Sequence, residues 1–318
     1  MPYNVPMQRL ALVRATPAQA RALDDGTHAA WPCGLGLEAH VEKEVRLRQG
    51  PWPASALSAW MLCDADHPEA PPVASCELYE MHARVDGRPG RVLAFASVFV
   101  PPALRGRGHA STLLTRLHAE VGGAEDVAAC ILFSDVGAPI YERLGYVARP
   151  AFDRTYPPEL RAAPPPGVLP LSETSLRALR PRAPAGRLDL APTLDQLDWH
   201  LDRSRLRAES LGVQRPARCG AVIDGDPEQH IVWVDEEGEL LVLTMAAASP
   251  EAAQSLVAAA QDAATRAGLA CVRAWETPDV PWPVGARAPR DGCLPMIRPV
   301  WADVEPADWT WVPRALWV

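Results

Sequence analysis

Residues 91–120 constrain the fold more than any other stretch of this chain. Residues 91–100 form an almost unbroken apolar run that ends at two prolines. Such a run is typical of a strand buried on both faces of a sheet. Leu113, Leu114 and Leu117 then recur at the three-and-four spacing of a helix that packs on a sheet. We therefore predict a strand, a glycine loop and a helix in direct succession.

The loop in this stretch contains Gly106 and Gly108. Glycine lets the backbone approach a ligand closely, and the helix that follows directs its unpaired N–H groups and positive dipole end at the loop. Such a loop is suited to phosphate or pyrophosphate, although glycine is also common in ordinary turns. It is neither a Walker loop nor a dinucleotide fingerprint, because no Lys-Ser/Thr pair and no third glycine follow.

The residues around the glycines resemble a known signature. Arg105, Gly108 and Ala110 match the Arg/Gln-x-x-Gly-x-Gly/Ala pattern of the GNAT acyltransferases. A second GNAT pattern follows in the expected order: Tyr141, then two residues, then Leu-Gly-Tyr at residues 144–146. The resemblance implies an α/β (α+β) fold with a mixed, mostly antiparallel sheet.

The same resemblance implies acetyl-CoA as the acyl donor and no metal. Amides of the glycine loop would hold the pyrophosphate of the coenzyme. A splay or bulge of the preceding strand would turn backbone N–H groups toward the thioester carbonyl. The residues implied in coenzyme binding are Val98, Phe99, Val100, Arg105, Gly106, Arg107, Gly108, His109 and Ala110.

The resemblance also places the acid and the base of the reaction. Tyr141 occupies the position of the general acid, and its alternative is a core tyrosine with a satisfied hydroxyl. Glu77 and Glu80 lie three residues apart on a strand, so they point to opposite faces and only one of them can face the acceptor. We assign Glu77 as the base and keep Glu80 as a candidate acceptor contact. His200 would reach the acceptor if the second half covers the cleft; otherwise it is a surface helix residue.

A chain of 318 residues is long enough for two domains. A proline-rich segment at 157–170 predicts a connector between a coenzyme-binding domain at 1–156 and a second α/β domain at 171–318 that covers the acceptor site. In the first domain we predict a helix that Thr16 caps and a hairpin turn at residues 86–90 that leads into the central strand. In the second domain we predict a helix capped by Thr193, three strands, and a helix opened by Ser249. The tryptophans of the C-terminal tail are expected to fix it to the body, or else to form a lid.

A narrower resemblance concerns the substrate. Residues 73–77, residues 96–102 with their glycine loop, Ser134-Asp135 before Tyr141, Trp199-His200 and the tryptophan-rich tail look like the fungal lysine N6-acetyltransferases of lysine catabolism. This implies acetylation of lysine or a related amino acid. Two other functions stay open: an acyltransferase that uses a longer acyl-CoA or an aminoacyl-tRNA, and a non-catalytic module that binds coenzyme A.

The amino-acid composition limits the kinds of partner and the cellular location that we expect. A formal charge of −8 argues against nucleic acid, whose backbone is bound by clustered Lys and Arg. The opening residues lack the basic start and apolar core of a secretory signal, and no run of eighteen apolar residues indicates a membrane span. Seven widely spaced cysteines predict reduced thiols. We therefore expect a cytoplasmic protein without a membrane anchor.

Overall fold

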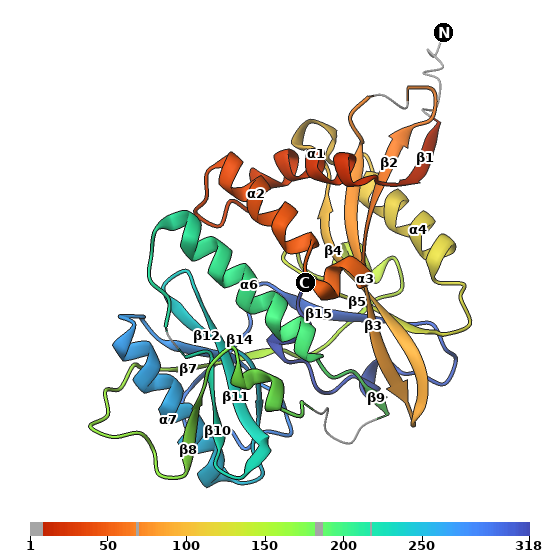
Figure 1. Ribbon diagram of the computed structural model, residues 1–318. Coiled ribbons are helices and arrows are strands. Elements are labelled where there is room, and N and C mark those ends of the chain that lie inside the picture. Colours follow the sequence, from red (N-terminus) through yellow and green to blue (C-terminus); the bar gives the residue numbers. More distant parts are fainter. Residues whose placement is uncertain (1–8, 68–69, 182–186, 217) are drawn as a thin grey trace.

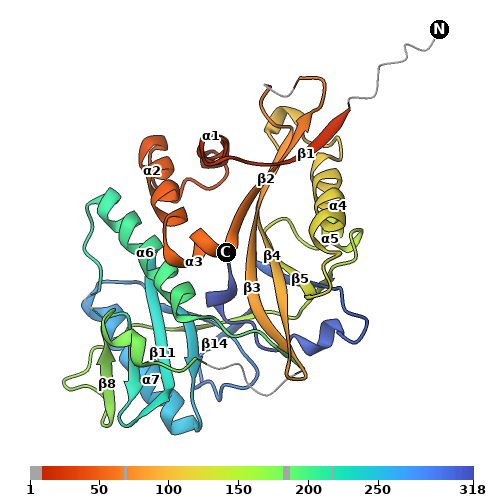
Figure 2. The same cartoon turned by 45° about the vertical axis from the view of Figure 1, so that its right-hand side comes forward.

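The computed structural model describes residues 9–67, 70–181, 187–216 and 218–318 (Figure 1). The opening residues, on which the expected lack of a secretory signal rests, lie outside these ranges. The described chain contains two sheets with helices packed on their faces (Figures 1 and 2).

The first sheet has the predicted mixed, mostly antiparallel character. Its strands lie in the order β1 (Leu10–Arg14), β2 (Leu57–Asp64), β3 (Ala74–Val85), β4 (Arg88–Phe99), β5 (Val127–Ser134), β15 (Leu294–Pro299) and β6 (Val147–Ala148), and β9 (Leu188–Asp189) pairs with β3. The β4–β5 pair is parallel. The remaining neighbours along this order are antiparallel. The two-residue turn between β3 and β4 confirms the predicted hairpin.

The end of β4 leaves the regular ladder. Ser75 pairs with Phe99 while Glu77 pairs with Ala96, so β4 carries one extra residue at this point. Ser97 adopts the left-handed conformation, with φ at +50°. Pairing between β4 and β5 stops at Phe95, although β5 continues to Ser134. The predicted bulge is therefore present, and it begins at Ser97, where the two parallel strands diverge.

Helices cover both faces of the first sheet. The apolar side of α4 (His109–Val121) packs on one face, with Leu113, Leu114 and Leu117 fully buried. The other face is covered by α1 (Pro17–His28), α2 (Leu37–Arg48) and α3 (Pro51–Ala56), as Figure 2 shows. The Thr16 side chain caps α1 in a capping box, as its sequence predicts.

The second sheet has the order β14 (Ala286–Pro289), β7 (Phe152–Tyr156), β13 (Val272–Trp275), β12 (Glu239–Ala246), β11 (Asp226–Glu236), β10 (Gly220–Ile223) and β8 (Val168–Leu171). One face packs on α7 (Pro250–Arg266), which Ser249 caps. The other face packs on α6 (Leu194–Leu211), which Thr193 caps. The opposite side of α6 contributes Trp199 and Leu206 to the core of the first half. Helix α6 thus packs on both halves.

The sheets correct the predicted boundaries. Strand β7 at 152–156 pairs within the second sheet, although the prediction placed it in the first domain. Strand β15 at 294–299 returns to the first sheet, between β5 and β6. The last residues of the predicted connector enter β8. The chain therefore crosses between the halves more than once, because these strands pair with partners that are remote in sequence.

Candidate functional site

A cavity of about 220 Å³ lies where β4 and β5 diverge. Its walls come from β3, the β4 bulge and β5, from α1 and α2, and from α6 and the C-terminal tail. Residues after 170 contribute Trp199, Arg203, Trp317 and Val318 to these walls. The second half therefore encloses the cavity on the side opposite the strands.

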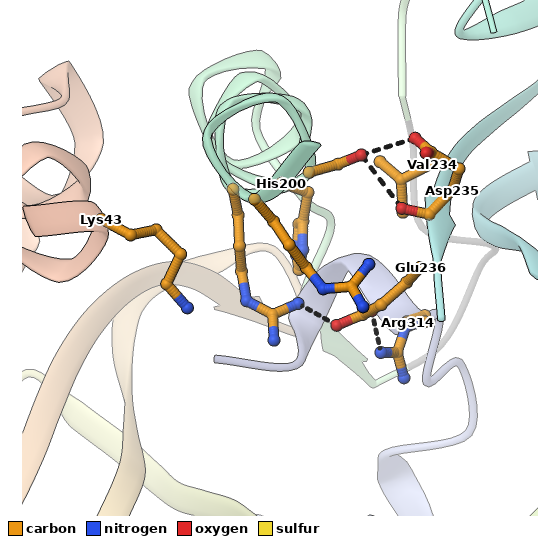
Figure 3. Close-up of a pocket in the computed structure, with 9 residues that line it drawn as sticks. Lys43, His200, Val234, Asp235, Glu236 and Arg314 are labelled. Atoms are coloured by element: carbon orange, nitrogen blue, oxygen red, sulfur yellow. Dashed lines mark hydrogen bonds and ion pairs between the residues drawn. The ribbon is translucent and has the colours of Figure 1, made fainter. Parts of the chain in front are cut away.

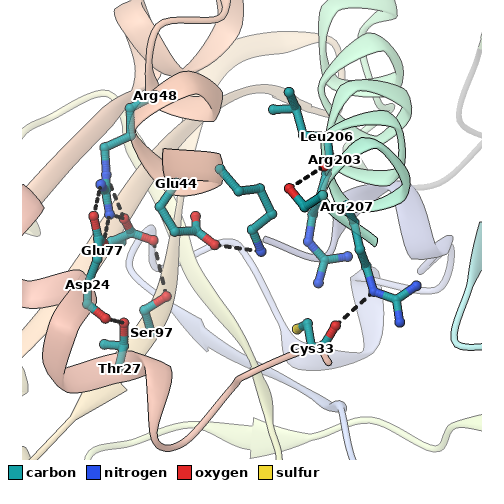
Figure 4. Close-up of polar contacts among 12 residues, drawn as sticks. Asp24, Thr27, Cys33, Glu44, Arg48, Glu77, Ser97, Arg203, Leu206 and Arg207 are labelled. Carbon is teal, nitrogen blue, oxygen red and sulfur yellow. Dashed lines mark hydrogen bonds and ion pairs between the residues drawn. The ribbon is translucent and has the colours of Figure 1, made fainter. Parts of the chain in front are cut away.

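Glu77 is held on the strand side of the cavity by two donors. Its Oε2 accepts a hydrogen bond from Ser97 Oγ at 3.1 Å, and its Oε1 accepts from Arg48 Nη2 at 3.0 Å (Figure 4). The same guanidinium donates to both carboxylate oxygens of the buried Asp24, at 2.7 and 2.5 Å. Burial raises the pKa of Asp24, although Arg48 opposes the rise. We call Arg48, Asp24 and Glu77 the strand-end cluster; it holds one cation and two carboxylates.

Tyr141 faces the same cavity from α5 (Pro139–Glu142), the short helix after β5. The turn before α5 is fixed by Ser134 Oγ, which donates to Gly137 O at 2.7 Å. Burial and the nearby carboxylate of Asp135 raise the pKa of Tyr141 to about 12. The phenol therefore keeps its proton at neutral pH and is able to donate it.

The glycine loop presents open backbone at the start of α4. Gly106 and Gly108 have φ of +76° and +79°, a region that L side chains rarely adopt. A Cβ built at either position would meet no heavy atom of the described residues within 4 Å. Gly108 is the N-cap of α4 and offers no side-chain hydrogen bond to the first-turn N–H groups. The loop therefore has the room and the donors that an anionic group needs.

The other residues implied in coenzyme binding lie around this loop and the bulge. Val98 lines the cavity, and the largely buried Phe99 contacts Trp31 edge-on. The exposed Arg105 donates through Nε to the carbonyl oxygen of Val100 at 3.1 Å. Arg107 donates to Ala103 O at 3.3 Å, and His109 and Ala110 begin α4. These contacts are local, so they shape the loop and leave its amides to a ligand.

The polar face of α2 is a feature that the sequence reasoning missed. His40, Lys43, Glu44 and Arg48 all line the cavity, although the mixed charge of α2 predicts a solvent-facing side. Lys43 is buried, and its Nζ pairs with Glu44 Oε1 at 2.8 Å (Figure 4). Burial on its own would raise the pKa of Glu44, but Lys43 and Arg203 outweigh it and the pKa is lowered. The signal was the four-residue spacing of 40, 44 and 48, which puts these side chains on one face of a helix.

The structure corrects two predicted acceptor contacts. Glu80 is exposed, pairs with Arg91, and does not line the cavity, because it points to the opposite face of β3 from Glu77. His200 is buried, not on the surface, and it too lies outside the cavity. Its Nε2 is 3.2 Å from Ala315 O, and it lines a separate void of about 10 Å³ together with Glu236 and Arg314 (Figure 3). Neither side chain therefore lines the cavity.

His200 gives a prediction about pH. Burial, together with Arg203 and Arg314, lowers the pKa of His200 to about 3, whereas an unfolded histidine titrates near 6.5. As the pH falls below 6.5, His200 becomes protonated in the unfolded chain but stays neutral in the folded protein. The free energy of unfolding therefore decreases. We expect His200→Gln, which keeps a donor for Ala315 O, to reduce the slope of unfolding free energy against pH between 6 and 4 by about 1.4 kcal/mol per pH unit. Urea unfolding at several pH values measures this; parallel slopes in variant and wild type would contradict it.

Metal and membrane features are absent from the described ranges. Among these residues no group of three or more His, Cys, Asp or Glu side chains could hold a metal ion. None of the helices described is long and apolar enough to cross a bilayer. The seven cysteines are free thiols.

Comparison with known proteins bears on both halves. Residues 171–288 match the family described as LYC1 GNAT-like C-terminal domain. None of the curated proteins matches the chain. Similar solved structures include a GCN5-related N-acetyltransferase from Kribbella flavida, with 16% identity over 92% of this chain and 72% of that one and a TM-score of 0.55. A conserved protein of unknown function from Enterococcus faecalis has 13% identity over 92% and 73%, with a TM-score of 0.58.

A third structure is similar over nearly its whole length. It is a GCN5-related N-acetyltransferase from Sphaerobacter thermophilus, with 13% identity over 93% of this chain and 97% of that one and a TM-score of 0.50. Likeness at these identities establishes architecture. The chain has the GNAT fold.

Proposed function

We propose that this protein is an N-acetyltransferase of the GNAT superfamily, which moves an acetyl group from acetyl-CoA to the amine of a small metabolite. One observation carries the proposal. The β4 bulge, Glu77 and Tyr141 come from three different elements and line one cavity. The GNAT fold and the acetyltransferase names of its structural neighbours support the reaction class.

The residues of the chain fit acetyl-CoA, which would supply an acetyl group on a thiol leaving group. Residues 106–110 combine two left-handed glycines, open space and the uncapped start of a thirteen-residue helix, which suits a pyrophosphate. The bulge that starts at Ser97 releases backbone groups of β4 from regular pairing with β3. Those N–H groups would bind the carbonyl oxygen as negative charge develops on it.

Acid and base roles follow from the side chains in the cavity. The attacking amine must lose a proton, and the departing thiolate must gain one. Glu77 would accept the first proton, directly or through water, while Arg48 and Ser97 hold its carboxylate in place. Tyr141, whose phenol is protonated at neutral pH, would donate the second.

The acceptor is proposed to be lysine or a related amino acid. Support comes from the match of residues 171–288 and from the walls of the cavity. Tyr79 and Trp199 offer aromatic surface in the same cavity as the carboxylates of Glu44 and Glu77, an environment that stabilises an ammonium. The placement of Tyr141 in the cavity disfavours a non-catalytic binding module, which needs no proton donor there.

A panel of amines tests the proposal. The protein is incubated with acetyl-CoA and one amine at a time, thiol release is followed, and the acetylated product is identified by mass. We expect amine-dependent thiol release, fastest with lysine or a close relative. Absence of amine-dependent release from every member, in a protein that binds coenzyme A, would overturn the proposed function.

A further inference from the structure

The charged side chains of the cavity are separated by sign along its length. The strand-end cluster has one guanidinium for two carboxylates. Farther along α2, Glu44 pairs with Lys43, which also lines the small void beside Arg203. At the end formed by α6 and the tail, positive charge is in excess.

Arg203 and Arg314 share a single carboxylate. Arg203 Nη1 donates to Glu236 Oε1 at 2.7 Å, and Arg314 Nη2 donates to Glu236 Oε2 at 2.9 Å (Figure 3). Burial opposes ionisation, but the two guanidiniums lower the pKa of Glu236 to about 2, so it is charged at neutral pH. Two guanidiniums and one carboxylate leave one positive charge in excess. Of these three side chains, Arg203 lines the cavity. Asp235 does not line the cavity, and it shares Arg215 with the exposed Glu173.

His40 adds an independent sign of a ligand. Its side chain is only 3% exposed and lines the cavity, yet neither ring nitrogen has a hydrogen-bond partner among the described residues. The neighbouring His28 is hydrogen-bonded through Nε2 to Leu35 O at 2.8 Å. Its ring contacts the His40 ring edge-on and forms no hydrogen bond with it. A buried polar group without a partner is costly, so His40 needs one from the contents of the cavity.

We propose that Lys43, Arg203 and His40 form an anion subsite that binds a carboxylate of the acceptor, at the opposite end of the cavity from the reacting amine. This rests on the proposed function and assigns its specificity to named residues. Lys43 and Arg203 donate charge-assisted hydrogen bonds to the carboxylate, and neutral His40 donates an N–H to it. The ammonium end of the acceptor lies at the strand-end cluster, where negative charge is in excess. The acceptor is therefore a zwitterion held by charges of opposite sign.

The geometry of α2 sets the spacing between the two charges. Lys43 and Arg48 are five residues apart, which is about 7.5 Å along a helix axis. This separation favours an acceptor whose acetylated amine is several bonds away from its carboxylate. An α-amino group, two bonds from its own carboxylate carbon, is too close to reach both ends.

A matched pair of ligands tests the subsite in the wild-type protein. Lysine and pentane-1,5-diamine have the same chain and the same terminal amine, but the diamine lacks the carboxylate. Affinity is measured by calorimetry with coenzyme A present, and kcat/KM by thiol release. Loss of one or two charge-assisted hydrogen bonds, at about 1.5–3 kcal/mol each, predicts at least a tenfold preference for lysine in both measurements.

Substitutions on α6 test whether Arg203 is responsible for the preference for lysine over the diamine. Arg203→Met is expected to bring the lysine-to-diamine ratio below about threefold with coenzyme affinity unchanged, and Arg203→Lys is expected to restore part of the ratio. Arg205→Met is the matched control, because Arg205 is on the same helix but pairs with Asp202 and Glu209 outside the cavity. Lys43→Met combined with Glu44→Gln preserves the local charge balance and should also lower the ratio.

The outcomes separate this inference from the proposed function. Equal affinity and equal turnover for lysine and the diamine in the wild type would overturn the subsite while leaving the acetyltransferase intact. Preferential binding of lysine without turnover of any amine would support the subsite and overturn the function. If Arg203→Met fails to fold, the subsite is tested by the lysine-to-diamine ratio of the wild type and by that of the Lys43→Met, Glu44→Gln double variant. A ratio that survives in both substituted proteins would also overturn the assignment.

Discussion

Replacing Tyr141 with phenylalanine is expected to lower kcat by roughly a hundred- to ten-thousand-fold, the usual contribution of a general acid. The ring of Tyr141 packs edge-on against Tyr146 at 6.1 Å between centroids, and phenylalanine preserves that contact. Only the hydroxyl is lost. Affinity for coenzyme A should therefore fall by no more than about tenfold, because a single neutral hydrogen bond is worth about 0.5–1.5 kcal/mol.

The matched control is Tyr156→Phe. Tyr156 is also buried and its hydroxyl donates to Pro283 O at 3.2 Å, but it lies in β7 of the second sheet, away from the cavity. We expect near wild-type turnover from this variant. Single-turnover kinetics are needed, so that a slow product release does not hide the chemical step. A fall of less than about threefold in the Tyr141→Phe single-turnover rate would make Tyr141 a packing residue and move the acid elsewhere.

The parts of the fold that the sequence predicts are those set by local patterns. The strand, glycine loop and helix of residues 91–120 form β4, the loop and α4. The caps at Thr16, Thr193 and Ser249 start α1, α6 and α7. In each case the signal lies within a few residues of the structure that it determines, through apolar spacing, a capping side chain or a glycine.

Strand β15 shows why other parts were missed. Its six residues include Pro295 and Pro299, and prolines argue against a strand inside a sheet. The strand tolerates them because β6 pairs with it only at Met296 and Ile297, between the two prolines. Its main partner is β5, with Ile297 opposite Ile131. Pairing between residues so far apart in sequence leaves no local pattern.

The residues of the candidate site also differ in whether a local sequence pattern predicts them. Tyr141 and the glycine loop stand in short motifs, so their positions are readable from the sequence. The alternation of side chains along β3 separates Glu77 from Glu80, and the structure has them on opposite faces. The charged face of α2 is different, because charge on a helix usually faces solvent. Only the packing of α6 across it, which brings Arg203 and Trp199 opposite, turns that face into a cavity wall.

Replacing Gly108 with valine is expected to reduce affinity for coenzyme A by roughly a hundredfold or more. The loop amides would donate to the pyrophosphate, and charge-assisted hydrogen bonds are worth about 1.5–3 kcal/mol each, so loss of two of them corresponds to that factor. Gly108 has φ of +79°, and the space beside it is open among the described residues. A valine there fills the space that phosphate oxygens need and strains the start of α4.

The strain calls for a control that shares it. Gly87 has φ of +81° and equally open surroundings, but it lies in the turn between β3 and β4, far along the chain from the glycine loop. Gly87→Val should therefore lose comparable stability and keep wild-type affinity for coenzyme A. Calorimetric titration of both folded variants, with melting temperatures recorded beside it, isolates the effect on binding. Because the two substitutions impose the same backbone cost, equal affinities for coenzyme A would show that the amides at 106–110 do not bind the pyrophosphate.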